Sequence, residues 1–189
     1  MSTVPSKRAD AAQNRERLLA EANRMFAEAA GPVSLEGIAR AAGVGIGTLY
    51  RHFPTKEALV DAVYQVELDA LDAEADRLLQ LHPAADAMRQ WMNLYARFVA
   101  AKHAMHEALR MTLTPRSGAM SEMRLRFKAT VSKFLDASQR DGSLRADVRA
   151  EDVVLTMAGS VFAATATGDP DQVSRVLDLV MVGLRSTPV

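Results

Sequence analysis

Residues 34–56, which read SLEGIARAAGVGIGTLYRHFPTK, contain two short helical patterns separated by glycine. Apolar residues at helical spacing predict a two-turn helix that ends at Gly43 and a second short helix over 46–52. Phe53-Pro54 ends the second helix, because proline disfavours helical geometry in the residue before it. Five apolar positions are spaced to form one small shared core: Ile38, Ala39, Ala42, Val44 and Leu49. This arrangement predicts a helix-turn-helix.

The rest of the chain also follows helical periodicity, and no segment alternates with a period of two over a useful length. Proline and glycine breaks bound most of the expected helices, which include a long one from Thr55 to about residue 81 and one after Pro83. A further short helix is expected over 102–111. The long helix is expected to carry an apolar stripe of Leu59, Val63, Val66, Ala70, Leu71 and Leu78. The sequence therefore predicts an all-α fold.

Composition excludes several classes of protein. The chain has no cysteine, which excludes a disulfide scaffold, a thiolate zinc site and a cysteine nucleophile. No apolar run approaches the length of a membrane span, and Met1–Asp10 lacks the apolar core of a signal peptide. A nucleophile elbow, a metal-ligand cluster and a phosphate-cradling glycine loop are also missing from the sequence. We therefore expect a soluble cytoplasmic protein that is not an enzyme, needs no cofactor or metal and has no membrane partner.

Charge is balanced overall, with 23 basic and 23 acidic residues, but it is uneven along the chain. Residues 61–82 hold one basic and six acidic residues. This acidic segment could be a solvated helix face, or it could be the binding surface of a helical protein-interaction module. Total charge alone does not indicate a nucleic-acid partner.

The second short helix of the helix-turn-helix is expected to present a polar row to solvent. Its outward residues are Ile46, Gly47, Thr48, Tyr50, Arg51 and His52. Small residues allow a helix to enter a groove closely, and hydroxyls and cations can meet phosphates. The alternative is a merely structural helical hairpin, for which two glycines and an exposed Tyr-Arg-His row are poor choices.

The most specific residues in this segment are Gly47-Thr48-Leu49-Tyr50, His52-Phe53, Lys56-Glu57 and Leu59, with Ile38-Ala39 and Ala42-Gly43-Val44 upstream. On these residues the chain resembles the TetR family of bacterial transcriptional regulators over roughly 12–62. The resemblance implies an N-terminal three-helix DNA-binding domain with a helix-turn-helix, followed by a helical ligand-binding and dimerisation domain. The expected division is a flexible arm over 1–11, the DNA-binding domain over 12–56, a connecting helix over 57–82 and the effector and dimerisation domain over 83–189.

The resemblance also implies roles for single residues. Ser34, Thr48, His52 and Lys56 match positions that hold phosphates. Tyr50 would contact the DNA backbone or a thymine methyl group, and Ile46 and Gly47 occupy positions that usually contact bases. Gly45 stands where the family often has a capping serine, and neither Ile46 nor Gly47 offers a side-chain hydrogen bond.

Base reading could therefore rely on methyl contacts, on Arg51 or on an arm in the minor groove. Lys7, Arg8 and Arg15 could form that arm, or Lys7 and Arg8 could belong to a merely solubilising tail.

The second half of the chain is rich in large, adaptable apolar residues. Met88, Trp91, Met92, Tyr95, Met123 and Phe127 could line an effector pocket or form a plain core. His103, His106 and Arg110 share one helix face, where they could grip an anionic ligand or lie in solvent or core. His103 and His106 could also bind a metal, but no third and fourth ligand is obvious.

Small residues gather in 157–168, beside an apolar stripe over 173–184. These two helices could form half of a four-helix bundle between subunits, or they could pack only within one chain. With the resemblance, the sequence predicts a homodimeric repressor that binds a palindromic double-stranded DNA operator and is released by an unknown small-molecule effector.

Overall fold

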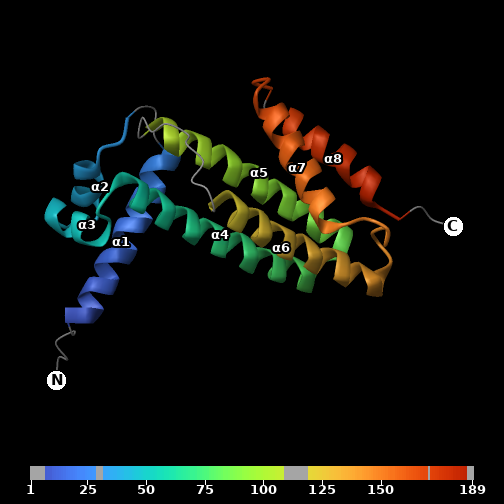
Figure 1. The fold of residues 1–189 in the computed structure, drawn as a ribbon, viewed down its shortest axis with the longest axis horizontal. Helices are drawn as coiled ribbons and strands as arrows, with labels where there is room; N and C mark the ends of the chain where they lie inside the picture. The colour runs from blue at the N-terminus through green and yellow to red at the C-terminus, as the bar shows by residue number, and fades with distance from the viewer. Residues whose placement is uncertain (1–6, 29–31, 109–118, 170, 187–189) are drawn as a thin grey trace. The chain divides into compact units, whose positions relative to one another are not determined.

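The computed structural model describes residues 7–28, 32–108, 119–169 and 171–186. Within these ranges the chain forms eight helices and no strand beyond one isolated bridge between Leu144 and Arg185. The helices are α1 (Lys7–Glu28), α2 (Leu35–Ala41), α3 (Ile46–His52), α4 (Lys56–Leu81), α5 (Ala84–Ala108), α6 (Ala119–Asp141), α7 (Ala150–Thr165) and α8 (Gln172–Leu184) (Figure 1). The predicted all-α fold is confirmed.

The chain divides into two compact units. The N-terminal unit comprises residues up to 67 together with 101–113, and the helical unit comprises 68–100 and 114–189. α4 and α5 each contribute to both units. The first part of α4 belongs to the N-terminal unit because Leu59, Val60 and Val63 are buried in its core.

The N-terminal unit forms because short-range signals start and stop each helix. The Ser34 hydroxyl accepts a hydrogen bond from the backbone N–H of Gly37 at 3.0 Å and so caps α2. Gly43 has a φ of 69°, the left-handed conformation that lets the chain turn after α2. The Thr55 hydroxyl accepts from the N–H of Ala58 at 3.1 Å and begins α4. α1, α2 and α3 all contact one another around Ile38 and Leu49, which are fully buried.

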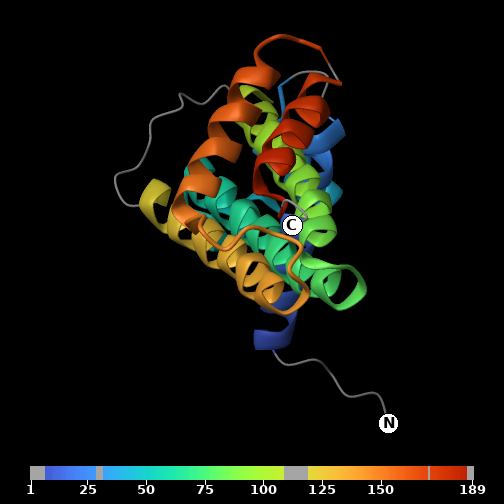
Figure 2. The ribbon, with the colours of Figure 1, turned by 90° about the vertical axis from the view of Figure 1, so that its right-hand side faces the viewer.

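The helical unit is built from longer, more apolar helices. α7 packs against both α6 and α8, as Figure 2 shows. Its core contains large side chains from α5, α6, α7 and α8, including Trp91, Phe134, Met157 and Leu177. The turn after α6 carries Gly142 at a φ of 67°, a left-handed conformation that glycine adopts readily.

Three expectations about the helices are wrong. α5 continues without a break from Ala84 to Ala108, so 102–108 is not a separate helix, because neither proline nor glycine interrupts this stretch. α1 begins at Lys7, so residues 7–11 of the expected arm are helical. Val66 and Ala70 of the expected α4 stripe are exposed, because the buried positions shift to Leu68 and Leu71 where α4 enters the helical unit.

Candidate functional site

The outward face of α3 is the part of the N-terminal unit that is open to a partner. Leu49 is fully buried and anchors the inner face of the helix. The N–H groups of Thr48 and Leu49 donate to the carbonyl of Gly45, which sits at the N-cap without a side-chain hydrogen bond. A Cβ added at Gly47 would meet nothing within 4 Å. The backbone of α3 can therefore be approached closely from outside.

The structure brings the predicted DNA-contacting residues onto this unit. On α3, the side chains of Ile46, Tyr50 and Arg51 are exposed, and those of Thr48 and His52 are half-buried. Lys56 is exposed at the first residue of α4. Ser34 is exposed, and its hydroxyl accepts from the N–H of Gly37, which leaves its own hydrogen free to donate. Arg51 and Lys56 form no ion pair with any residue in the described ranges.

The structure places all three residues predicted to form a DNA-binding arm on α1. Arg8 is exposed in the first turns of α1, while the side chain of Lys7 and residues 1–6 lie outside the described part of the chain. Arg15 is also exposed, and its guanidinium lies 5.4 Å from the centre of the Phe53 ring. This cation–π contact joins α1 to the end of α3. Arg15 therefore has a packing role inside the unit.

The predicted pocket residues gather in the core of the helical unit. Met88, Trp91 and Met92 are fully buried, and Met123 packs partly buried against the same cluster. The Tyr95 ring stacks on Trp91 with centroids 6.0 Å apart and meets the Phe127 ring edge-on at 4.9 Å.

Two further predicted ligand residues cannot be placed. His106 belongs to α5, but its side chain, like that of His103, lies outside the described residues, as does all of Arg110. In the described part of the chain, no group of three or more His, Asp or Glu residues could hold a metal ion.

The acidic segment is partly paired within the helical unit. The Asp72 carboxylate lies 2.6 Å from Nε of Arg126 and accepts a hydrogen bond from the Thr130 hydroxyl at 2.6 Å. Asp69 also pairs with Arg126, and Asp76 pairs with Lys133 at 2.7 Å. α4 and α6 are thus joined by a row of charged contacts. Asp69 and Asp76 stay more than half exposed, so this part of the segment is a solvated face that also carries ion pairs.

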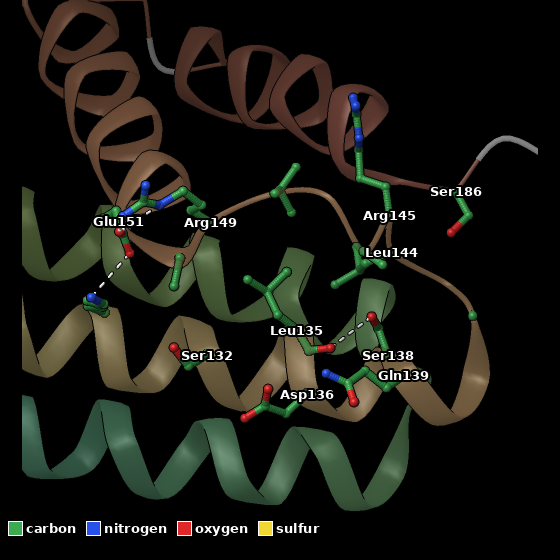
Figure 3. A pocket seen from close by; sticks show the side chains of 15 residues that line it. Ser132, Leu135, Asp136, Ser138, Gln139, Leu144, Arg145, Arg149, Glu151 and Ser186 are labelled. Carbon is green, nitrogen blue, oxygen red and sulfur yellow. Dashed lines mark hydrogen bonds and ion pairs between the residues drawn. The ribbon is translucent and has the colours of Figure 1, made fainter.

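A groove of about 590 Å³ lies beside the second half of α6 and was not predicted from the sequence (Figure 3). It is lined by α6 residues such as Ser132, Leu135 and Gln139 and by residues 142–151.

Three of the charged groups at the groove pair with one another. Glu151 pairs with Arg149 and with Lys128, the latter at 3.2 Å. The pKa of Glu151 is lowered to about 2 by a hydrogen bond from its own backbone N–H and by these two cations. Helical periodicity carries no signal for such a groove, because it depends on how a loop returns over α6.

Comparisons with known proteins agree with this geometry. Residues 18–63 match the family model of bacterial regulatory proteins of the tetR family, and residues 83–186 match the C-terminal domain of SbtR-like transcriptional regulators. A TetR transcriptional regulator from Streptomyces coelicolor is 38% identical, with a TM-score of 0.72 over 92% of this chain and 99% of that one. A TetR regulatory protein from Mycobacterium vanbaalenii is 35% identical, with a TM-score of 0.68 over 96% and 100%.

Among curated proteins, an HTH-type transcriptional regulator from Staphylococcus aureus is 43% identical over 63 residues, which are 33% of this chain and 34% of that protein. The chain thus matches about a third of the length of these curated relatives. None of the described helices combines the length and the hydropathy that crossing a membrane would require. The C-terminal family match covers more than half of the chain, and the two bacterial structures match it nearly end to end. The chain therefore belongs to the TetR family of bacterial transcriptional regulators.

Proposed function

We propose that this regulator is a repressor that binds a palindromic operator as a homodimer and leaves it when a small molecule binds. One observation carries the DNA-binding part: the outward face of α3 is open at Gly47 and is flanked by Arg51 and Lys56, which have no acidic partner among the described residues. An α-helix fits the major groove of B-DNA, and a position without a side chain allows close approach. Unpaired cations at the rim suit phosphates.

The contacts on DNA follow from these positions. Thr48, His52 and Lys56 bind phosphates, and the N–H groups at the start of α4 assist Lys56. Ile46 and Tyr50 meet thymine methyl groups, and Arg51 reads a base edge or a phosphate. Ser34 donates its hydroxyl to a phosphate at the start of α2.

The dimer is supported by an apolar surface on α7 and α8. Four large side chains there, namely Leu155, Phe162, Leu179 and Val182, are 67% to 76% exposed. A Cβ added at Gly159 or Gly183 would meet nothing within 4 Å of the same chain. Exposed apolar side chains and glycines on neighbouring helices suit close packing against a second copy. Phe162, on α7, is the most exposed of the four.

The division of labour follows the two units. The N-terminal unit binds DNA, and the helical unit binds the effector near Trp91 and Tyr95 and holds the dimer. Such coupling is reciprocal. Operator DNA therefore lowers the affinity for the effector by the same factor by which the effector lowers the affinity for operator DNA. A protein that acts on bacterial chromosomal DNA works in the cytoplasm.

Selection of bound sequences from random duplex DNA tests this proposal. The expected result is an inverted repeat with half-sites about one helical turn apart, on the order of 34–36 Å, or a multiple of it. A screen for small molecules that release the selected duplex then tests the effector part. Enrichment of no sequence at low salt would contradict the proposal.

A further inference from the structure

Tyr95 on α5 is a buried residue whose polar group lacks a partner. The side chain is 5% exposed, and its ring lies among the rings of Trp91 and Phe127. Its hydroxyl forms no hydrogen bond with any residue that the structure describes. Neighbouring buried groups are satisfied: the Trp91 Nε1–H donates to the carbonyl of Leu71 at 3.1 Å, and the Thr130 hydroxyl donates to Asp72. A buried hydroxyl that finds no partner within the chain is satisfied only from outside it, by water or by a bound molecule.

The Tyr95 hydroxyl is also not sealed inside the protein. Among the described residues, every fully enclosed side-chain nitrogen or oxygen has a hydrogen-bond partner. Since the Tyr95 oxygen has none, it retains access to something outside the packed chain. Burial raises the pKa of Tyr95 to about 12, so the group is a neutral hydroxyl at pH 7 and can donate.

The ring of Tyr95 lies in apolar surroundings. It belongs to a buried cluster that includes Leu, Ala, Met, Trp, Phe and Val side chains. Phe98 adds a third ring edge-on to Phe127 at 5.9 Å. Arg126, which precedes Phe127 on α6, pairs with Asp69 and Asp72. An ionic group would be desolvated here without compensation, whereas an apolar molecule with one acceptor would be stabilised.

We infer that the Tyr95 hydroxyl is the polar anchor of the effector site and that the effector is an uncharged, largely apolar molecule that presents a hydrogen-bond acceptor such as a carbonyl oxygen. The aromatic walls suit a flat or ring-containing molecule. This inference rests on the proposed function, because it names the chemical class of the releasing molecule. An anionic effector held by His106 and Arg110 is the competing outcome.

The test uses 9-fluorenone and fluorene, which share one shape and differ in a carbonyl oxygen. The dissociation constant of each probe is measured for the full-length protein through the emission of Trp91, the single tryptophan. The wild type is expected to bind fluorenone about 5–10-fold more tightly, the worth of one neutral hydrogen bond. Tyr95→Phe keeps the ring and should bind both probes with the affinity that the wild type has for fluorene.

Tyr64→Phe is the matched control. The Tyr64 hydroxyl donates to the carbonyl of Lys102 in the N-terminal unit, so its loss should leave the fluorenone preference unchanged. Melting curves establish that both variants are folded. Fluorene-9-carboxylate, the anionic probe, should bind more weakly than fluorenone.

The inference is overturned if fluorenone and fluorene bind the wild type equally, if neither probe binds, if Tyr95→Phe retains the preference, or if the carboxylate binds most tightly. Operator binding is measured on the same samples. A wild-type protein that prefers fluorenone but binds no DNA would contradict the repressor proposal and support the Tyr95 site. A wild-type protein that binds its operator but does not prefer fluorenone would contradict the Tyr95 site and support the repressor proposal.

Discussion

Two surfaces of this regulator are left open by its own fold, and they differ in chemistry. The outward face of α3 carries Tyr50, Arg51 and an open backbone at Gly47, with Lys56 nearby in the sequence. The face formed by α7 and α8 carries Phe162 and Leu179, which are exposed and apolar. The α3 face is well solvated, and its binding to DNA is favoured when phosphates replace water and counterions. The α7–α8 face is apolar, and its burial against a partner is favoured because it removes apolar surface from water.

The difference indicates which partner each surface fits. A polar face with a glycine fits a charged groove, whose depth determines how close the helix comes. An apolar face on two packed helices fits an identical face related by a two-fold axis. Changes at the two surfaces should therefore separate DNA affinity from dimer affinity.

The largest effect is expected for Phe162→Asp. The interface of a two-fold symmetric dimer would lose two buried phenyl groups, each worth about 1.5–3 kcal/mol of burial, and would gain two buried charges. The dimer dissociation constant should rise by more than about 100-fold, as measured by sedimentation velocity over a range of concentrations. Leu125→Asp on α6 is the matched control, because Leu125 is 66% exposed and lies outside α7 and α8. A Phe162→Asp protein as dimeric as this control would show that the assigned face is wrong.

The next effect is expected for Gly47→Val. A Cβ added at Gly47 meets nothing within 4 Å in the free protein, so we expect no fall in the melting temperature. On DNA it would clash at the closest approach and weaken operator binding by about 1–3 kcal/mol per half-site. Fluorescence anisotropy with the selected duplex measures this loss. Unchanged affinity would mean that α3 does not enter the groove at this position.

A smaller and sequence-independent effect is expected for Lys56→Ala. Loss of one phosphate contact per protomer should weaken specific and random duplexes alike and reduce the salt slope by about one per protomer. Lys133→Ala is the control, because Lys133 pairs with Asp76 in the helical unit and should not alter the slope. A Lys56→Ala protein with altered sequence preference and unchanged overall affinity would contradict the phosphate role.

The smallest effect is expected for Gly45→Ser. The N-cap of α3 has no side-chain hydrogen bond, and a serine hydroxyl there can accept from the N–H groups of the first turn. The gain should be a few tenths of a kcal/mol, or about 1 °C in melting temperature. Gly45→Ala, which adds the methyl group without the oxygen, should lower the melting temperature. Equal effects of serine and alanine would rule out capping.

The sequence predicted the N-terminal unit well because its signals are local. Ser34, Gly43 and Thr55 each act within three or four residues, as caps or as a left-handed turn, so their roles can be read without knowing the fold. The pairing of Asp72 with Arg126 joins residues 54 positions apart, and no local pattern encodes such a contact. The groove beside α6 depends on the returning loop in the same way.

For the helical unit, the sequence predicted which large apolar residues gather in the core better than it predicted where the helices begin and end. Trp91 and Phe127, both expected in a pocket or a plain core, meet edge-on with ring centroids 6.2 Å apart. The continuity of α5 through 102–108 was missed, although no helix-breaking residue lies in this stretch.

The central claim is that two α3 helices of a dimer read two half-sites at once. Its most direct test is a titration of wild-type protein against the selected inverted repeat and against a duplex of equal length with one half-site scrambled. We predict two protomers on the inverted repeat and an affinity at least about 100-fold above that of the scrambled duplex. Equal affinities, or a single protomer on the inverted repeat, would contradict the account.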